Sequence, residues 1–579
     1  MAANGGFGSK LPPLSPTNAA DIRSDAANTG ASVMQSQHFH CAPTAVRHSN
    51  PDRSVFAAPI ATAAVAIASM LPTIVAAQTP GALDANFALG IGKIPAIAMG
   101  AGASRGNAAL VQPDSRILLF GSCSNGTDDD FCATRLLPDG NTDTTFVGPG
   151  GTGNGKVILP IGSGNDVGQA IALRADGKIV LAGHCTAAVA SDFCVARLLP
   201  DGSYDTTFVG PAGNGAGKFL VSVGATDNAA FVLIQPDSKI LVGGQCDMGG
   251  ATGFDFCVIR LNDDGTLDTT FVGPSGTGNG KVSFPISTGI AGDTPVAAAL
   301  MSDGRIVIGG TCDSGTTFCA ARLNPNGTFD ATFAGPGGNG AGRFAFAMTA
   351  GPDMASGMEV QPDGKVLLSG TCRGTTNDFC VARLNVGGTL DNTFSGPSGS
   401  GAGKVLIDVS DGNDIARTMR LLPDGKIMLA GNCVGGVTLD YCLVRLNGDG
   451  TLDSTFDGPT GTGGGKVTFP VGNGSDTIRS LVRQPDGKIV AFGSCTESIE
   501  NFCVARVHGG PFGYRACSPD IDGDNQVLAT IDGLILSRVA LGIRGNAVIN
   551  GISFPAHATR NTWSQIRDYL WSQCGMNVY

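Results

Sequence analysis

The chain has 579 residues, which is too long for one small core and predicts two or more folded units. It contains 87 glycines and only 15% charged residues, a composition typical of short strands joined by glycine-rich turns rather than of long helices. The hydrophobic fraction of 42% argues against general disorder. The net charge of −11 repels phosphate backbones, so nucleic acid is not expected as a partner, whereas acidic loops could hold cations.

The N-terminal region reads as two segments. Residues 1–54 are polar and mixed in composition, and we expect a disordered extension there. Residues 55–77 read as a signal peptide, because Val55–Leu71 is apolar and uncharged, Arg53 precedes it, and residues 75–77 resemble a small-residue cleavage site. The mature chain would then carry no membrane span. A membrane anchor is the alternative, for which the run is slightly short of the ~20 residues that cross a bilayer.

Residues 78–510 are repetitive. A Phe-Cys or Tyr-Cys dipeptide recurs seven times at intervals of 61 to 63 residues, with the cysteines at Cys132, Cys194, Cys257, Cys319, Cys380, Cys442 and Cys503. Each unit holds four short apolar segments bounded by turn sequences such as P-D-G, and in one unit these are Lys156–Ile161, Ala170–Arg174, Lys178–His184 and Phe193–Leu198. Four strands in about 60 residues predict one blade of a β-propeller, with a solenoid as the competing repeat architecture.

The phase of the repeat predicts how the ring closes. We place the second strand of each unit beside the central channel, because it is a continuous run of small apolar residues followed by a tight turn. An outer-type strand at Gly92–Ile97 then has no blade of its own, and the last unit ends at Val507 without an outer strand. The N-terminal strand would complete the seventh four-stranded blade and remove the open edge. The predicted fold is therefore an all-β, seven-bladed propeller plus a small α-helical C-terminal module.

The units also resemble a known family. The elements G-x-L-D-x-x-F, P-D-G-K-I and F-x-x-A-R-L are similar to those of the bacterial delta-60 repeat proteins, from Pro80 to Val507. This resemblance implies a β-propeller and implies no particular reaction.

Each unit carries two cysteines, one at the end of the third strand and one at the start of the fourth. These strands form a hairpin, so both sulfurs would lie near the same loop. We predict the disulfides Cys123–Cys132, Cys185–Cys194, Cys246–Cys257, Cys312–Cys319, Cys372–Cys380, Cys433–Cys442 and Cys495–Cys503. Regularly paired cysteines indicate an oxidising compartment.

The strand register supports this pairing. Placing Cys185 opposite Cys194 puts the apolar residues of both strands on one face. A disulfide that closes such a short loop stabilises by about 2–3 kcal/mol in the chain-entropy model. Zinc binding would favour C-x₂₋₄-C spacing with histidines, and redox chemistry would favour a C-x-x-C motif.

Two further polar series recur in every unit and predict buried struts. An arginine lies in each FCVARL strand, at Arg135, Arg197, Arg260, Arg322, Arg383, Arg445 and Arg506. An aspartate precedes a phenylalanine, at Asp84, Asp143, Asp205, Asp268, Asp330, Asp391 and Asp453. An arginine buried between blades needs a partner, so we expect each arginine to pair with an aspartate. A functional ring of arginines is the alternative.

A third series of aspartates precedes the inner strands, with Ser104 in its place in the first unit. Its members are Asp166, Asp227, Asp293, Asp353, Asp414 and Asp476. The loops that carry them would ring one mouth of the channel. A channel-mouth ring that binds cations or a polar ligand is one hypothesis, and the other, which we favour, is that each aspartate caps its own turn.

Residues 511–579 lose the repeat and gain helical character. The segment Asp520–Gln526 resembles the calcium loop of dockerin and EF-hand modules, because carboxylates at alternate positions can point at one ion. The predicted calcium ligands are Asp520, Asp522, Asp524, Gln526 and Asp532. Asp532 falls one residue later than the EF-hand pattern requires. The alternative is an aspartate-rich turn that caps the following helix.

Two helices and a disulfide complete the predicted module. The first helix spans Gly533–Leu541 and the second spans Thr562–Gln573, with apolar residues on one face. Cys517 and Cys574 bracket the module and are expected to pair. Only one calcium loop is visible, so docking to a cohesin is not expected.

No catalytic motif is visible in the mature chain. Its three histidines, His184, His508 and His557, share no motif, and no nucleophile elbow or phosphate loop is found. We therefore predict a non-enzymatic binding or surface-scaffold protein, monomeric and exported by a bacterium, whose partner is an extracellular protein or glycan. The alternative is a propeller-framed extracellular enzyme, a metal-dependent lactonase or a glycoside-acting enzyme, with carboxylates at the channel mouth. The near-identity of the units favours binding.

Overall fold

A computed structural model describes residues 79–510 and 520–572, apart from residues 152, 188–189, 250–252, 289–290, 339, 397–401, 435–437, 459–462, 525, 542, 544 and 556–557. The predicted extension 1–54 and signal segment 55–77 lie outside these residues. Within the described part, no helix is long and apolar enough to span a bilayer.

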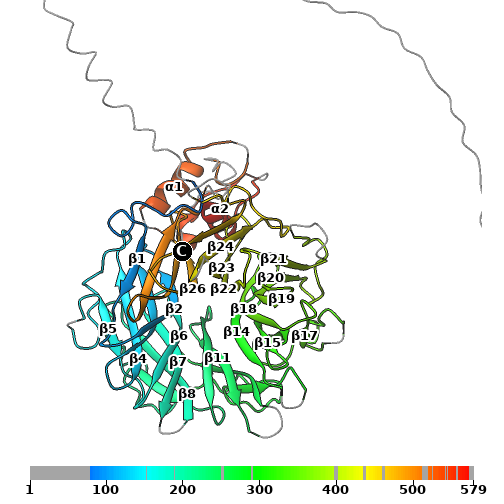
Figure 1. Ribbon diagram of the computed structural model, residues 1–579. Coiled ribbons are helices and arrows are strands. Elements are labelled where there is room, and N and C mark those ends of the chain that lie inside the picture. The colour runs from blue at the N-terminus through cyan, green and yellow to red at the C-terminus, as the bar shows by residue number, and fades with distance from the viewer. Residues whose placement is uncertain are drawn as a thin grey trace, which may run out of the picture. The chain divides into compact units, whose positions relative to one another are not determined.

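Residues 79–510 form a seven-bladed β-propeller, as predicted, and each blade is a four-stranded antiparallel sheet. Seven inner strands lie around the centre of the ring (Figure 1): β2 (Ser104–Val111), β6 (Asp166–Leu173), β10 (Asp227–Ile234), β14 (Thr294–Leu300), β18 (Asp353–Val360), β22 (Ile415–Leu421) and β26 (Asp476–Arg483). Next outward are β3 (Ile117–Ser124), β7 (Ile179–Ala187), β11 (Ile240–Asp247), β15 (Ile306–Cys312), β19 (Val366–Arg373), β23 (Ile427–Val434) and β27 (Ile489–Thr496).

The two remaining positions of each blade complete the sheet. Third come β4 (Asp129–Leu136), β8 (Ala190–Leu198), β12 (Phe254–Leu261), β16 (Thr317–Leu323), β20 (Asn377–Leu384), β24 (Leu439–Leu446) and β28 (Glu500–Val507). The outer strands are β5 (Lys156–Leu159), β9 (Lys218–Val221), β13 (Lys281–Phe284), β17 (Arg343–Phe346), β21 (Lys404–Ile407), β25 (Lys466–Phe469) and, in the seventh blade, β1 (Lys93–Ile97). The seventh sheet has the order β1-β28-β27-β26, so the N-terminal strand closes the ring as predicted.

The core lies between neighbouring blades. Residues of β3 and β4 are almost all buried, because each sheet is covered on both faces. Phe120 and Phe131 of the first blade pack in one cluster with Leu181, Cys185 and Cys194 of the second. The interior of the ring is therefore a series of equivalent apolar layers, one at each blade interface.

The seven predicted intra-blade disulfides are present, with Cα–Cα distances of 5.6–5.9 Å. Their cysteines are at most 1% exposed. The expected register is wrong by two residues, since Cys185 lies opposite Asp192 and Cys194 lies opposite Gly183. The pairing of β7 with β8 continues to Ala187 and Ala190, which fixes this register. A shift of two preserves the face of every side chain, so both sulfurs still meet.

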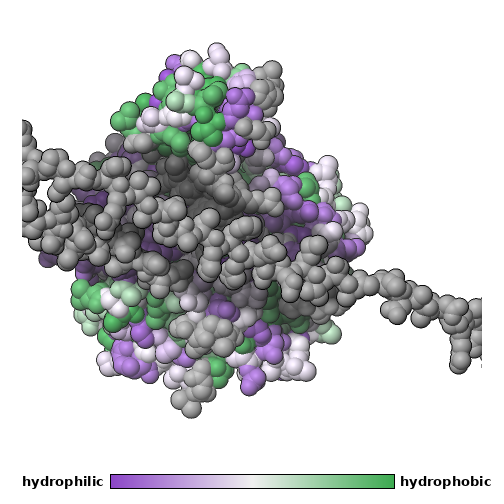
Figure 2. Space-filling view, turned by 90° about the horizontal axis from the view of Figure 1, so that it is seen from above, coloured by the Kyte–Doolittle hydropathy of each residue, from purple (hydrophilic) through white to green (hydrophobic). Residues whose placement is uncertain are grey.

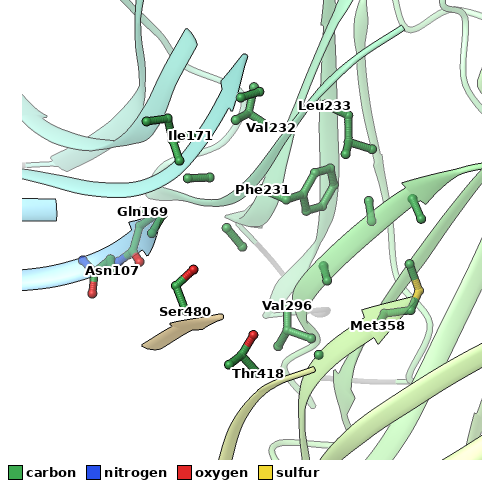
Figure 3. Close-up of a pocket in the computed structure, with 18 of the residues that line it drawn as sticks. Asn107, Gln169, Ile171, Phe231, Val232, Leu233, Val296, Met358, Thr418 and Ser480 are labelled. Atoms are coloured by element: carbon green, nitrogen blue, oxygen red, sulfur yellow. The ribbon is translucent and has the colours of Figure 1, made fainter. Parts of the chain in front are cut away.

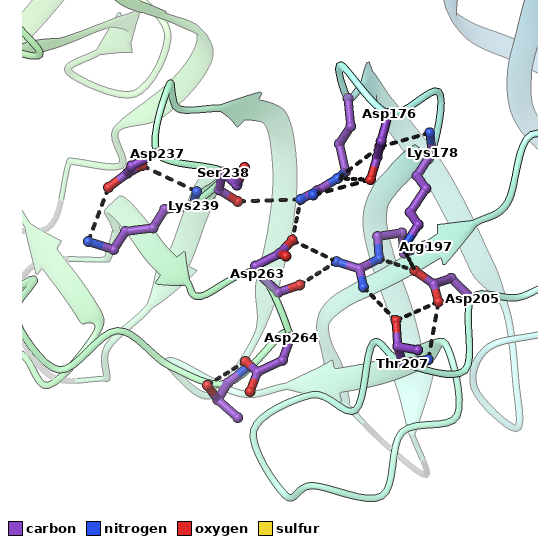
Figure 4. Close-up of polar contacts among 12 residues, drawn as sticks. Asp176, Lys178, Arg197, Asp205, Thr207, Asp237, Ser238, Lys239, Asp263 and Asp264 are labelled. Atoms are coloured by element: carbon purple, nitrogen blue, oxygen red, sulfur yellow. Dashed lines mark hydrogen bonds and ion pairs between the residues drawn. The ribbon is translucent and has the colours of Figure 1, made fainter.

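The predicted Arg–Asp struts are present at all seven interfaces. Figure 4 shows the strut of the second blade. In the second blade Arg197 Nε donates to Asp205 at 2.7 Å, and its Nη2 donates to the Thr207 hydroxyl. The guanidinium lies 4.5 Å from the centroid of the Phe208 ring. Its Nη1 donates to the carbonyl of Asp263 in the next unit, so one side chain joins two blades.

Each strut aspartate has a second cationic partner that the sequence reasoning missed. It is the lysine or arginine that ends the turn after each inner strand and follows an Asp-Gly or Asp-Ser pair, as Lys178 does for Asp205 at 2.9 Å. The equivalent partners of the other aspartates are Arg116, Lys239, Arg305, Lys365, Lys426 and Lys488. The available signal was the recurring sequence of an aspartate, a glycine or serine, and a lysine or arginine, which was interpreted only as a turn.

The C-terminal module contains α1 (Asp532–Ala540), the short 3₁₀ helix η1 (Gly545–Val548) and α2 (Trp563–Ser572). Both helices start and end within one residue of their predicted bounds. Ile521, Ile535, Ile566 and Leu570 form its apolar core. The predicted Cys517–Cys574 bond lies outside the described residues.

We expect that replacing Arg197 with Met will lower the free energy of unfolding by about 3 kcal/mol, because Asp205 would stay buried with one cation fewer. Urea denaturation followed by circular dichroism measures this. The control is Arg105→Gln, which removes an exposed ion pair with Glu500 and should cost less than about 1 kcal/mol. Equal losses in the two variants would contradict a special role for the strut.

Candidate functional site

The third aspartate series lies at the starts of the inner strands, where each carboxylate caps the preceding turn and does not face the central cavities. All six aspartates are fully buried. Each carboxylate accepts hydrogen bonds from the turn before it, as Asp166 does from the Ile161 amide at 2.7 Å and from the Gly162 amide. The same contacts recur at Asp227, Asp293, Asp353, Asp414 and Asp476. None of the six is among the side chains that line the central cavities.

Burial perturbs these carboxyls. Desolvation raises the pKa of Asp166 to about 6, although the Ile161 and Gly162 amides oppose the shift and the charge of Asp130 adds to it. Burial likewise raises the pKa of Asp227, Asp414 and Asp476. The pKa values of the strut aspartates are instead lowered. Burial would raise the pKa of Asp143, but hydrogen bonds from Thr145 and the charge of Arg135 outweigh it and lower the pKa to about 2.

The centre of the propeller contains a cavity of about 590 Å³, which lies between the inner strands (Figure 3). A second cavity of about 520 Å³ adjoins the starts of these strands and also contacts His184 and Gln245. Volumes of this size suit a small ligand or part of a larger one. On the coloured part of the face in Figure 2, hydrophilic and hydrophobic residues are interspersed in small groups.

A β-bulge in every inner strand supplies the residue that faces both cavities. The register of each inner strand skips one residue, three positions after the capping aspartate or Ser104. The skipped residues, which we call the bulge ring, are Asn107, Gln169, Ala230, Val296, Ser356, Arg417 and Arg479, in blade order. A bulged residue has no cross-strand partner, and bulges commonly redirect a side chain toward a site.

A glycine that recurs in every blade makes room for each bulge. The residue opposite the position before the bulge is a glycine in all seven blades, such as Gly121 and Gly431. A Cβ at Gly121 would collide with the carbonyl oxygen of Arg105, and one at Gly431 would collide with that of Ile415. The G-x-C sequence near the end of β3, β23 and their equivalents, the strands next to the inner ones, is therefore the signature of the bulge. In the sequence its cysteine was interpreted and its glycine was overlooked.

The bulge ring is where the blades stop being equivalent. Going round the ring from the fifth blade to the second, its residues are Ser356, Arg417, Arg479, Asn107 and Gln169, all polar. The third and fourth blades contribute Ala230 and Val296. The cavity therefore has a polar arc with two adjacent guanidinium groups and an apolar arc across from it. The predicted near-identity of the units fails at this position.

The two arginines of the ring have no acidic partner among the described residues. Burial, followed by the charge of Arg479, lowers the pKa of Arg417. Burial lowers the pKa of Arg479 as well; the charge of Glu500 opposes the shift and the charge of Arg105 adds to it. Arg417 Nε lies 3.4 Å from the amide oxygen of Asn432, a neutral group.

Carboxylates are scarce around this cavity. Among the described residues that line the two cavities, Glu359 is the only acidic one, and it forms an ion pair with Arg420 at 2.9 Å. His184 faces the second cavity, where burial lowers the pKa of its imidazole.

The C-terminal module holds a second candidate site. Carboxylate oxygens of Asp520, Asp522 and Asp532 all lie within 4.8 Å of one another. Asp522 is 1% exposed, and its Oδ2 is buried without a hydrogen-bond partner. Burial and the charges of Asp532 and Asp524 raise the pKa of Asp522 to about 6. An oxygen cluster of this kind fits Ca²⁺, which binds carboxylates and carbonyls.

The remaining predicted ligands differ in how they lie relative to this carboxylate cluster. Asp524 is buried beside the cluster, and its Oδ1 accepts the Gln526 amide. Gln526 is exposed. Asp532 lies in the first turn of α1 and accepts the backbone amides of Ile521 and Leu528, so it also braces the loop.

Comparisons with known proteins agree with the fold. Six segments, at residues 112–146, 174–208, 235–271, 302–333, 361–394 and 422–456, match the family described as "Domain of unknown function (DUF5122) beta-propeller". These repeats therefore fit a β-propeller repeat family. No curated protein matches the sequence.

Similar solved structures are distant. A virginiamycin B lyase from Staphylococcus aureus is 9% identical, with 71% of this chain and 98% of that chain covered and a TM-score of 0.39. A PL25 ulvan lyase is 11% identical, with 72% and 96% covered and a TM-score of 0.43. A periplasmic gluconolactonase from Pseudomonas aeruginosa is 13% identical, with 64% and 87% covered and a TM-score of 0.35. At these TM-scores the likenesses carry no argument about this chain.

The opposite pKa shifts predict a stability maximum at about pH 4–5. Carboxyls with a raised pKa, such as Asp166, take up protons in the folded state before the unfolded state does, so stability rises as the pH falls from 7 to about 4. Carboxyls with a lowered pKa, such as Asp143, lose their contribution as the pH falls further toward 2. His184 and His508, whose pKa values are lowered, oppose the first trend.

Thermal unfolding midpoints between pH 2 and pH 8 test this expectation. Asp166→Asn should flatten the rise between pH 7 and pH 4 and leave the fall below pH 4 unchanged. A midpoint that decreases steadily from pH 7 downward would contradict the expected balance.

Proposed function

We propose that this chain is an exported binding or surface-scaffold protein, in which the propeller is a rigid frame and its central cavity takes part in ligand binding. One observation carries the proposal: the blades are equivalent at their interfaces and differ at the bulge ring, which faces the cavity. Variable side chains on a rigid frame are the usual arrangement of a binding site.

Export is supported by the seven disulfides. They are buried at the blade interfaces, and disulfides persist in oxidising compartments such as the periplasm or the outside of the cell. An extracellular protein or a glycan is the partner class that we propose, and the acidic net charge disfavours nucleic acid.

Binding is favoured over catalysis by the cavity lining. Hydrolysis of a glycoside usually needs two carboxylates, whereas Glu359 is the only acidic residue among the described lining and is held by Arg420. The enzyme alternative rests on His184, whose burial keeps the imidazole neutral enough to act as a base.

A glycan array and a turnover screen with lactones and glycans, both on the full chain, separate the two functions. We expect saturable binding without turnover, with the urea-unfolded chain as the negative control. Turnover that His184→Gln abolishes, without loss of fold, would establish the enzyme and contradict our proposal.

We further propose that Asp520, Asp522, Asp524, Gln526 and Asp532 hold Ca²⁺ and that the ion stiffens the C-terminal module. Support comes from the close approach of three carboxylates and from the buried, unpartnered Oδ2 of Asp522. A bound cation would supply the charge that this oxygen lacks.

Calcium should raise the temperature at which the module unfolds. At a calcium concentration 100 times the dissociation constant, the free energy of unfolding should increase by about 2.7 kcal/mol. Trp563 and Trp571, the only tryptophans, both lie in α2, so their fluorescence reports on the module alone. Magnesium at the same concentration and the Asp522→Asn variant are the controls. A midpoint that calcium leaves unchanged relative to chelator would refute the calcium site.

A further inference from the structure

The ring arginines differ from the other arginines at the blade interfaces in how their charge is balanced. Every strut guanidinium forms an ion pair with a buried aspartate, as Arg445 does with Asp453. Arg105, which lies on β2 beside the same channel mouth, is paired with Glu500 at 2.9 Å. Arg417 and Arg479 are the two cations of the bulge ring, on adjacent blades, and the described residues give neither a carboxylate.

Arg417 is half-buried and Arg479 is exposed, and they occupy the bulges of adjacent blades. Two like charges so placed repel each other, and burial of one of them strengthens the repulsion, which destabilises the folded chain. The bulge positions could carry neutral residues at no cost to the fold, since five other blades have Asn, Gln, Ala, Val or Ser there. The structure therefore keeps an unfavourable arrangement at a position where packing does not require it. Such arrangements are typical of functional sites, where stability is traded for binding.

We propose that the bulge ring is an anion-binding site, in which Arg417 and Arg479 together bind one carboxylate group of a compact ligand. This inference rests on the proposed binding function and names the chemical class of its ligand. An oxyanion is the natural partner of paired guanidinium groups, because several N–H donors converge on its oxygens.

The rest of the ring defines the shape of the ligand. Ser356, Asn107 and Gln169 flank the arginines and offer further hydrogen bonds, and Figure 3 shows Asn107 and Gln169 on one side of the cavity with Thr418 and Ser480 nearby. Across the cavity, Ala230, Val296 and Phe231 form an apolar wall. The ligand accordingly carries its charge at one edge and an apolar or weakly polar face at the other.

The geometry also explains why the site takes an anion although the whole protein is acidic. The capping aspartates, which would otherwise make this mouth negative, are buried in their turns and hydrogen-bonded to backbone amides. Arg105 and Glu500 neutralise each other. Among the described residues that line the two cavities, Arg417 and Arg479 are the charged side chains outside an ion pair, because Glu359 is paired with Arg420.

Calorimetric titration of the full chain at low salt tests the proposal, with hexanoate and glucuronate as probes and hexanamide and glucose as their neutral counterparts. We expect at least one anion to bind saturably and about tenfold more tightly than its neutral counterpart. Preference for glucuronate would identify an acidic sugar as the source of the charge, and preference for hexanoate would identify an aliphatic acid. Higher salt should weaken the anion in either case.

The variant Arg417→Gln/Arg479→Gln should lose the tenfold preference, whereas Arg105→Gln, the matched control, should keep it. The double variant should also unfold at a temperature equal to or above that of the wild type, because a repulsion is removed. A purely structural role for these arginines would lower that midpoint instead.

Three results would overturn the inference: no saturable binding of either anion, an unchanged preference in the double variant, or a lowered midpoint in that variant. None of these results decides the broader function. A chain that fails with both anions but binds a neutral glycan on the array is still a binding protein, with a ligand of another class.

Discussion

The buried ion pair at each blade interface is the contact on which the ring depends. All three guanidinium nitrogens of Arg197 donate hydrogen bonds, to Asp205, to Thr207 and to a carbonyl of the next unit, so this buried charge is balanced within the interface. Lys178 gives the aspartate a second cation. Because the carbonyl belongs to the next unit, the pair fixes the angle between neighbouring blades as well as the structure of its own blade.

Closure of the ring uses the same contact across the greatest sequence distance. Asp84 and Arg506 form the strut of the seventh blade, and β1 adds its outer strand to β28. The disulfides do different work, because each links residues only 7 to 11 positions apart within one hairpin. Covalent bonds therefore stabilise each blade locally, while charge pairing and the closing strand hold the blades together.

Most of this architecture could be predicted from the sequence, since it repeats. Seven periods fixed the number of blades, the phase of the repeat fixed closure by Gly92–Ile97, and strand parity fixed the faces. A register error of two residues at Cys185 did no harm for the same reason. The bulge ring could not be found this way, because a bulge breaks the period of two and the search was for residues that recur. Aligning the units on Asp166 and its equivalents would have exposed one column that varies, three residues later.

The bulge position varies between blades because it contributes less to the stability of the fold than any other position of an inner strand. The residues on either side, such as Ala416 and Thr418, are buried and are paired across the sheet with residues of β23, which constrains them. The bulged residue has no cross-strand partner and points to the channel, so a change there leaves the struts, the disulfides and the apolar layers intact. In a ring of nearly identical units, binding specificity can arise only at positions where the residue may differ from blade to blade without disturbing the blade interfaces. In this chain two adjacent blades carry arginines at this position, Arg417 and Arg479, and their mutual repulsion has no equivalent at the other bulges.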